Sequence, residues 1–192
     1  GARLGYVIFY NLRFFLEHSV EILVLWHGGM SFHGGLIGAF VAGYVGIKRK
    51  GIHFWKAADL IIPTAPVGIA LGRLGNFING ELYGRATQVP WGMIFPHGGP
   101  LRRHPSQLYE SALEGWVLFG VLWYCKDKKL SSGMLLAIFL FLYGCFRSLL
   151  EFFREPDAQL GFILGPFTMG QVLSAFMIGG GIFLFYYLSK KK

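Results

Sequence analysis

The chain has 192 residues, of which 54% are hydrophobic, 17% aromatic and only 15% charged, with a formal net charge of +8. A water-soluble domain usually carries about a quarter charged residues, so this composition argues against a soluble globular protein and favours an integral membrane protein. The chain begins at Gly1 rather than Met, and residues 1–10 read like the end of an apolar helix. No cleavable signal sequence is visible there, so we expect the natural N-terminus to be missing.

Five apolar segments follow, and each is about long enough to cross the hydrocarbon core of a bilayer. They cover residues 31–47, 54–72, 108–125, 133–150 and 167–188. The second segment is expected to be irregular because it contains Pro63 and Pro66. We therefore predict an all-α fold, a polytopic integral membrane helix bundle. It would have five full transmembrane helices, a partial N-terminal one and irregular glycine-rich segments at the outer leaflet. Residues 1–192 are expected to form a single membrane-embedded domain, with 86–106 as a short outer loop.

Lysine and arginine are distributed unequally along the chain. Basic clusters at 48–50, 126–129 and 190–192 are placed in the cytoplasm by the positive-inside rule, and the three placements agree with one another. All nine lysines and Arg49 then lie on the inner side, whereas the other eight arginines lie at or near the outer side. The net charge therefore reflects membrane topology and does not predict nucleic-acid binding. Eight of the ten acidic residues, Glu114 among them, also lie on the outer side. Because the arginine fork matches phosphate or carboxylate, the outer arginines and acids indicate an ionic site there, and the alternative is that Arg–Glu pairs merely tie loops together.

The first polar stretch at the outer level is HGGMSFHGGLIG, residues 27–38. His33 opens a predicted membrane helix, and the glycines at 34, 35 and 38 leave one face bare. Such a face lets a neighbouring helix or a lipid headgroup approach closely. The alternative for His33 is an interfacial histidine satisfied by the backbone.

The second stretch is GRLGNFINGELYGR, residues 72–85, which follows an apolar run. It contains Arg73, Asn76, Asn79 and Glu81, and we expect its four glycines to free the backbone for turns and close contact. Charged groups inside a bilayer cost about 2.5–3.5 kcal/mol each on insertion scales, so they face a cavity or one another and mark a functional site. The alternative is a glycine-rich plug held by its own hydrogen bonds.

The third stretch, residues 143–157, carries Tyr143, Arg147, Glu151 and Arg154 at spacings of four, four and three. On a helix these side chains line one face, which must look inward within so apolar a segment. The alternative is a purely structural pair of Arg147 with Glu151.

A fourth, weaker patch is RRHPSQLYE, residues 102–110. Pro105 and Ser106 predict the start of a helix, with His104 just before it and Glu110 in its first turns. The free N–H groups of that helix end would suit an anion, although an ordinary capped helix is the alternative.

Together these stretches resemble the prolipoprotein diacylglyceryl transferase family over the whole length of the chain. The residues that carry the resemblance are HGGLIG at 33–38, GRLGNFINGELYGR at 72–85, RHPSQLYE at 103–110, REPDAQ at 154–159 and MGQ at 169–171. The chain departs from the family in lacking its first transmembrane helix, and Gly1–Tyr10 resembles only the latter part of the second. The outer loop between Arg85 and Arg102 is also short.

The resemblance implies a multi-pass enzyme of the bacterial cytoplasmic (inner) membrane, with its active site toward the periplasmic leaflet and its C-terminus in the cytoplasm. Such an enzyme transfers the diacylglyceryl group of phosphatidylglycerol to the lipobox cysteine thiol in a prolipoprotein signal peptide, the first step of lipoprotein maturation, and releases glycerol phosphate. No metal, nucleotide or other cofactor is implied. The partners are the two substrates and the lipid bilayer, with no nucleic acid, and the oligomeric state is left open.

The resemblance singles out Arg73 and Arg147 as essential, and we expect both to clamp the phosphate. The thiol needs a base, for which we expect His33, with His104 as a second candidate. Glu151 is expected to orient Arg147.

The remaining expected site residues bind or shape the substrate pocket. Tyr143 would hydrogen-bond the headgroup, Asn76 and Glu81 would bind the glycerol hydroxyls or shape the pocket, and Gly84 would allow a turn. Asn79 and Arg154 complete the expected substrate-binding set. Two other classes of function remain open, a channel or transporter for an anionic solute and an inactive relative that scaffolds partners.

Overall fold

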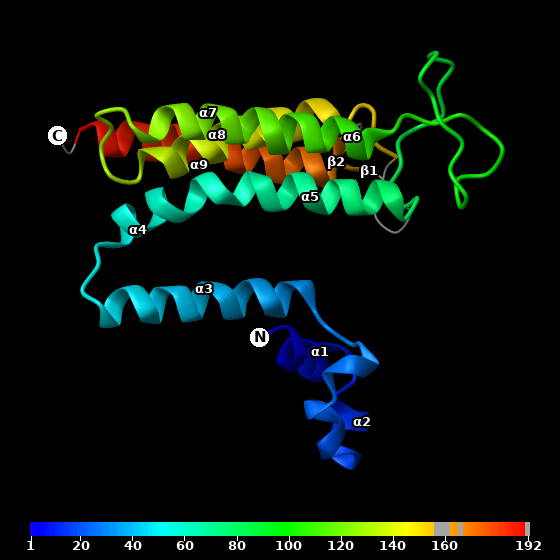
Figure 1. Ribbon diagram of the computed structural model, residues 1–192, viewed down its shortest axis with the longest axis horizontal. Helices are drawn as coiled ribbons and strands as arrows, with labels where there is room; N and C mark the ends of the chain where they lie inside the picture. Colours follow the sequence, from blue (N-terminus) through cyan, green and yellow to red (C-terminus); the bar gives the residue numbers. More distant parts are fainter. Residues whose placement is uncertain (156–161, 165–166, 191–192) are drawn as a thin grey trace. The chain divides into compact units, whose positions relative to one another are not determined.

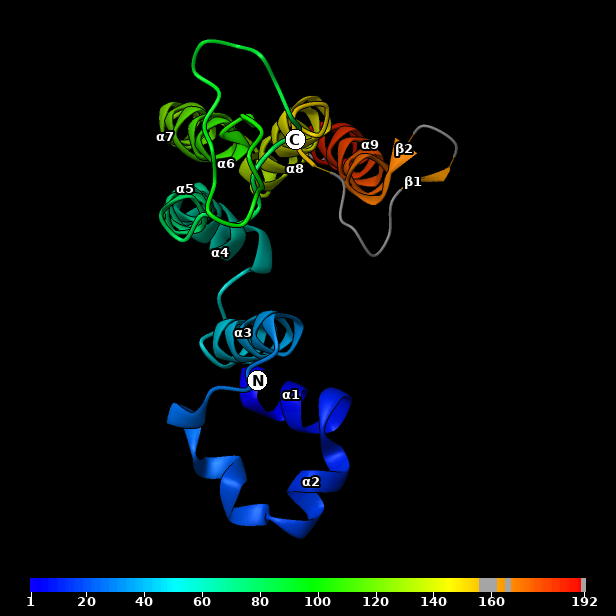
Figure 2. The same ribbon diagram turned by 90° about the vertical axis from the view of Figure 1, so that its right-hand side faces the viewer.

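The computed structural model describes residues 1–155, 162–164 and 167–190 (Figures 1 and 2). The side chains at positions 27, 32, 33, 162–164 and 167 are not among those described. The chain divides into two compact units, Gly1–Ala57 and Ala58–Lys192, and each is considered by itself.

The first unit is built on a long helix, α3 (Phe32–Arg49), and a short one, α1 (Ala2–Tyr10). Between them the chain forms α2 (Leu12–Glu17) and the 3₁₀ turns η1 (Ser19–Leu23) and η2 (Leu25–His27). The guanidinium of Arg3 donates to the carbonyls of Ile22 and Val24 at 3.2 and 2.9 Å, so this arginine holds the connecting segment.

The glycines at the start of α3 serve helix packing. A Cβ atom added at Gly34 would lie 2.9 Å from the Cα of Gly5 on α1, which no real side chain tolerates. The sequence predicted that either a neighbouring helix or a lipid headgroup approaches this bare face. In the structure a neighbouring helix does so, and it is α1. The Ser31 hydroxyl caps α3 by accepting the N–H of Gly34 at 3.2 Å.

The second unit is a set of helices lying side by side (Figures 1 and 2). The helix α4 (Phe54–Ile61) starts in the first unit and leads through the 3₁₀ turn η3 (Ile62–Thr64) into α5 (Ala65–Ile78). After a loop come α6 (Ser106–Glu110), the π-helical segment η4 (Ser111–Val117) and α7 (Leu118–Lys126), which run on without a break. The last elements are α8 (Met134–Leu150), the strands β1 (Phe162–Leu164) and β2 (Phe167–Thr168), which pair antiparallel, and α9 (Met169–Ser189).

Local chemistry explains several of these boundaries. Pro63 lies in η3. The irregularity predicted for the second apolar segment is therefore this 3₁₀ turn. The carboxylate of Asp59 accepts the N–H groups of Gly133 and Leu135 at 2.6 and 3.1 Å and so caps α8 from another helix. Thr168 and Gln171 form a capping box at the start of α9.

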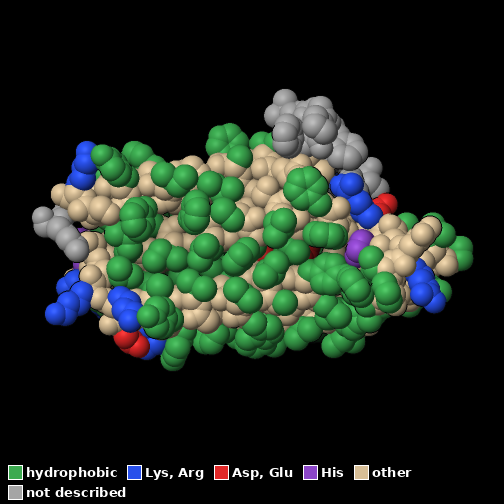
Figure 3. All heavy atoms as spheres, turned by 90° about the horizontal axis from the view of Figure 1, so that it is seen from above, with side chains coloured by type: hydrophobic (Ala, Val, Ile, Leu, Met, Phe, Trp, Pro, Cys, Tyr) green, Lys and Arg blue, Asp and Glu red, His purple; other side chains and the backbone are tan. Residues whose placement is uncertain are grey.

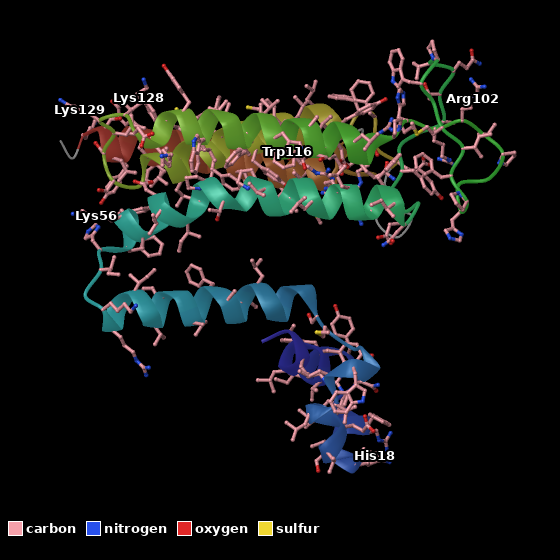
Figure 4. All side chains as sticks on the ribbon, viewed as in Figure 1. His18, Lys56, Arg102, Trp116, Lys128 and Lys129 are labelled. Carbon is pink, nitrogen blue, oxygen red and sulfur yellow. The ribbon has the colours of Figure 1, made fainter. Side chains whose placement is uncertain are left out.

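The interior of the second unit has an apolar part and a charged part. Leu118, Leu122 and Leu135 form a buried cluster where α7 packs on α8. On the face shown in Figure 3, hydrophobic side chains are spread along the length of the molecule, while charged ones gather toward the ends. Lys128 and Lys129 lie at one end of this unit and Arg102 at the other, as the lysine and arginine distribution predicted (Figure 4).

The predicted helical class is confirmed, and the β1–β2 pair is a small addition that the sequence did not predict. Within the described residues, two helices are long and apolar enough to cross a membrane, Phe54–Ile78 and Met169–Ser189. The count of five full transmembrane helices plus a partial one stays a prediction.

Two predicted boundaries were wrong. The second apolar segment does not end at residue 72 but continues as helix to Ile78, because no proline follows Pro66 to interrupt it. The helix α8 ends at Leu150, and Arg154 lies beyond it rather than on one face with Tyr143 and Arg147. Pro156 follows closely in the sequence, and the residue before a proline avoids helical geometry.

Candidate active site

A cluster of arginine and glutamate side chains joins three helical stretches in the interior of the second unit. Arg73 on α5 places its Nε atom 2.9 Å from Oε2 of Glu110 at the end of α6. Arg147 on α8 places Nη1 2.8 Å from the other oxygen, Oε1, of the same carboxylate. One buried carboxylate therefore holds two guanidinium groups that come from different helices.

A second carboxylate lies one turn further along, in the π-helical segment. The oxygens of Glu114 are 3.7 Å from Nη1 of Arg147 and 3.9 Å from Nη2 of Arg73, beyond hydrogen-bond distance. Both Glu110 and Glu114 have side chains that are 0% exposed. Removing one partner from so buried an ion pair typically costs about 3–5 kcal/mol, so the members of this cluster depend on one another.

Glu151 extends the cluster toward α9. Its Oε2 lies 2.9 Å from Nη2 of Arg147, and its Oε1 accepts the hydroxyl of Thr168 at 2.8 Å. The expectation that Glu151 orients Arg147 agrees with this geometry. Arg147 thus has both terminal nitrogens bound to carboxylates, whereas the terminal nitrogens of Arg73 make no hydrogen bond to the described residues.

The stretch GRLGNFINGELYGR is helical in its first half and turns sharply in its second. Gly72 and Gly75 lie inside α5, so the expectation that they make turns was wrong, and Gly80 at φ 69° is the turning residue. Asn76 and Asn79 both donate to Oε1 of Glu81, at 2.9 and 3.4 Å. These three side chains form one hydrogen-bonded group at the end of α5.

Gly84 is required because other backbone comes too close for a side chain. It forms an antiparallel bridge with Arg154, and its N–H donates to the carbonyl of His104 at 2.9 Å. A Cβ atom here would collide with the carbonyl oxygen of Phe153 and lie 2.8 Å from that of His104. Gly84 therefore joins the motif to the segments before α6 and after α8, rather than making a turn as expected.

Arg154 and Tyr143 both lie near the charged cluster. The Nη1 atom of Arg154 is 3.9 Å from Oε1 of Glu110, and its carbonyl accepts the Nε–H of Arg85 at 2.8 Å. Tyr143 stacks on Phe139 with ring centroids 5.6 Å apart, and its phenol interacts electrostatically with Arg73, Arg147, Glu110 and Glu114.

His104 ends a short hydrogen-bonded chain at the edge of the site. The indole N–H of Trp91 donates to the Tyr109 hydroxyl at 2.7 Å, and that hydroxyl lies 3.2 Å from Nδ1 of His104. Because an indole can only donate, the proton of Tyr109 is available for Nδ1, which leaves Nε2 as the N–H of the ring. Partial burial lowers the pKa of His104 and favours this neutral form.

His33 lies near the start of α3 in the first unit, and its side chain falls outside the described residues. The structure thus brings together Arg73, Arg147, Glu151, Tyr143 and Arg154, places Asn76, Asn79 and Glu81 at the end of α5, and sets Gly84 against His104. No group of three or more His, Cys, Asp or Glu in the described part of the chain could hold a metal ion.

Sequence reasoning missed the two carboxylates at the centre of the cluster. Glu110 appeared only as a residue of a capped helix start, and Glu114 only as an acid near the outer side. Their spacing of four within the apolar run LYESALEGW was the signal, because ionisable residues one turn apart share an inward face of a membrane helix. Glu114 also lies in a π-helical segment, a feature frequent at functional sites.

The geometry suits binding of an anionic oxygen group. Arginine donors aligned in a largely buried site stabilise negative charge more than they would in water, and they need little reorganisation. A phosphate ester that loses its alkyl group develops charge on oxygen, which such donors stabilise.

Comparison with known proteins agrees with this chemistry. The family model described as prolipoprotein diacylglyceryl transferase matches residues 1–187. Proteins named phosphatidylglycerol–prolipoprotein diacylglyceryl transferase from Desulfotalea psychrophila and Geobacter sulfurreducens are each 54% identical to the chain, cover 100% of it and are themselves covered to 73% and 74%. The protein of that name from Bordetella avium is 52% identical, with 100% of the chain and 73% of the relative covered. The chain therefore belongs to the prolipoprotein diacylglyceryl transferase family.

Proposed function

We propose that this chain transfers the diacylglyceryl group of phosphatidylglycerol to the lipobox cysteine thiol in a prolipoprotein signal peptide. Glycerol phosphate is released, and the reaction is the first step of bacterial lipoprotein maturation. The observation that carries the proposal is the largely buried pair Arg73 and Arg147, held 2.9 and 2.8 Å from one buried carboxylate. Family membership supplies the substrates, because the relatives are named for this transfer.

In the proposed reaction the thiolate sulfur attacks the glycerol carbon of the diacylglyceryl group. The carbon–oxygen bond to phosphate breaks, and the phosphate oxygen leaves with the electron pair. Stabilising the charge on that oxygen lowers the barrier, and arginine donors aligned beforehand do this well. We assign the first contact with phosphate to Arg73, because its terminal nitrogens make no hydrogen bond to described residues, and a supporting contact to Arg147.

Removal of the thiol proton requires a base. We keep His33 for this role, because an imidazole titrates in the neutral range. His104, the second candidate, is better suited to donate a hydrogen bond from Nε2, since the chain from Trp91 through Tyr109 supplies a proton to Nδ1. We assign Tyr143, Asn76, Asn79, Glu81 and Arg154 to binding the headgroup and shaping its pocket.

We further propose that the chain is one multi-pass domain in the bacterial cytoplasmic membrane. Its site would face the outer leaflet and its C-terminus the cytoplasm. The separation of Lys128 and Lys129 from Arg102 at opposite ends of the second unit supports this orientation (Figure 4). The bilayer and the signal peptide would then be its partners.

The test is a transfer assay with the purified chain in vesicles that contain phosphatidylglycerol. A synthetic peptide with a lipobox cysteine should gain the mass of one diacylglyceryl group, whereas the same peptide with serine in place of cysteine should not. Vesicles without phosphatidylglycerol should give no product. Absence of product, under conditions where the Geobacter sulfurreducens relative converts the peptide, would contradict the proposal.

A further inference from the structure

One nitrogen of each arginine proposed to bind phosphate is already paired with Glu110. Its Oε1 accepts a hydrogen bond from Nη1 of Arg147 at 2.8 Å, and its Oε2 forms an ion pair with Nε of Arg73 at 2.9 Å. A phosphate offers the same arrangement of oxygens, so Glu110 holds the guanidinium groups as an anionic ligand would.

Glu114 is buried beside the same two arginines and yet bonds to neither. Both of its oxygens are completely buried without a hydrogen-bond partner among the described residues. They lie 3.7 Å from Arg147 and 3.9 Å from Arg73, so a shift of about 1 Å would bring either guanidinium within the ~2.8 Å of a charge-assisted hydrogen bond. An unbonded buried carboxylate is unfavourable, and its position implies a use in another state of the site.

Among the described residues, the formal charges of the cluster are already balanced. Three arginines, at positions 73, 147 and 154, lie within 4 Å of three glutamates, at positions 110, 114 and 151. A phosphate that enters this site adds negative charge to a neutral group in a medium that screens poorly. It must therefore replace an existing carboxylate at the arginine donors rather than add to it.

We propose that Glu110 and Glu114 are positioning residues, which hold the guanidinium groups of Arg73 and Arg147 in place and release them to bind the substrate. Glu110 holds the donors of Arg73 and Arg147 in place before phosphate arrives. When phosphate oxygens replace Glu110, Glu114 accepts the guanidinium N–H groups that turn toward it and keeps both arginines in the site. This inference rests on the proposed function for the identity of the phosphate, but its test does not need turnover.

Binding of inorganic phosphate and of glycerol phosphate to the full chain in detergent, measured by calorimetry, tests the proposal. Removing one negative charge beside the arginines should tighten phosphate binding, so we expect about tenfold tighter binding for both Glu110→Gln and Glu114→Gln. Glu110→Asp keeps the charge and should show no tightening. The matched control is Glu155→Gln, because Glu155 pairs with Arg103 at 2.9 Å outside the cluster.

Kinetics separate positioning from a merely structural role. Glu110→Gln should lower KM for phosphatidylglycerol while lowering kcat about tenfold, because the donors bind the anion better but are no longer aligned for the transition state. A simple loss of folding would reduce kcat without lowering KM.

Phosphate binding that is unchanged or weaker in both Glu110→Gln and Glu114→Gln would overturn the proposal. If Glu110→Gln does not fold, Glu114→Gln decides alone, since that substitution breaks no hydrogen bond to the described residues. A chain that binds phosphate as predicted but transfers no lipid would contradict the proposed function and leave this inference standing. A chain that transfers lipid without the predicted change in phosphate affinity would support the proposed function and contradict this inference.

Discussion

Nη1 of Arg147 lies 2.8 Å from Oε1 of Glu110, and this ion pair ties α8 to the end of α6 inside the bundle. The same guanidinium reaches Glu151 through Nη2 at 2.9 Å. One side chain thus uses its two terminal nitrogens to set the distance between two carboxylates, which only a planar, forked cation can do.

Arg147→Lys should therefore impair the chain although it keeps the charge. A lysine ammonium cannot bind Glu110 and Glu151 in this geometry, so we expect transfer activity to fall about a hundredfold, comparable with losing one donor at a site of developing charge. Turnover of the lipobox peptide measures this. The control is Arg102→Lys in the exposed loop between α5 and α6 (Figure 4), and equal activity of the two variants would contradict the fork argument.

Gly84→Ala should destabilise the second unit. The added methyl group would meet the carbonyl oxygens of Phe153 and His104, and such overpacking costs about 1–3 kcal/mol. Thermal unfolding in detergent measures the loss. Gly68→Ala is the matched control, because nothing lies within 4 Å of a Cβ atom at that position in α5. A transition temperature of Gly84→Ala as high as that of Gly68→Ala would contradict the close contact.

Asp59→Ala should weaken the start of α8 without touching the charged cluster. The loss of a carboxylate that accepts two backbone N–H groups, from Gly133 and Leu135, should cost about 1–2 kcal/mol. Thermal unfolding measures it, with Asp127→Ala as the control, since among the described residues the carboxylate of Asp127 makes only an exposed pair with Lys126. Transfer activity of the folded fraction should stay unchanged for both variants.

His104 should make the stability of the folded chain depend on pH. Its pKa is lowered in the folded state, so the unfolded chain binds more protons as the pH falls below about 6.5. Its contribution to stability is complete above that pH and decreases as the pH falls through the folded pKa. Unfolding measured between about pH 7.5 and pH 5 should show a smaller loss of stability in His104→Gln than in the original chain.

Substitutions of His104 also distinguish a role as hydrogen-bond donor from a role as base. The amide nitrogen of glutamine reaches the place of Nε2, whereas that of asparagine reaches only the place of Nδ1. We therefore expect His104→Gln to keep most transfer activity and His104→Asn to lose about tenfold, the lower end of what a positioned donor or acid contributes. Equal and severe losses in both variants would favour the base instead.

Local sequence predicted the helical class and most helix positions, because long apolar runs and their charged boundaries are local properties. The segments predicted at 133–150 and 167–188 became Met134–Leu150 and Met169–Ser189. The motif residues were also recognisable, since arginine, asparagine and glutamate are costly inside a membrane wherever they occur. The end of α5 was misplaced, because the glycines at 72 and 75 read as turn residues although the helix continues through them.

The sequence by itself determined which helices form, which end of the second unit carries lysine, and that Arg73, Arg147 and Glu151 belong to a polar site. Only the tertiary structure decided how these groups pair. Glu110 lies 37 positions from Arg147 in the chain, and Gly84 forms its antiparallel bridge with Arg154, which lies 70 positions further along. Partners so far apart are set by how α5, α6 and α8 pack, because buried charges must find counter-charges within about 4 Å and no local pattern records which ones they meet.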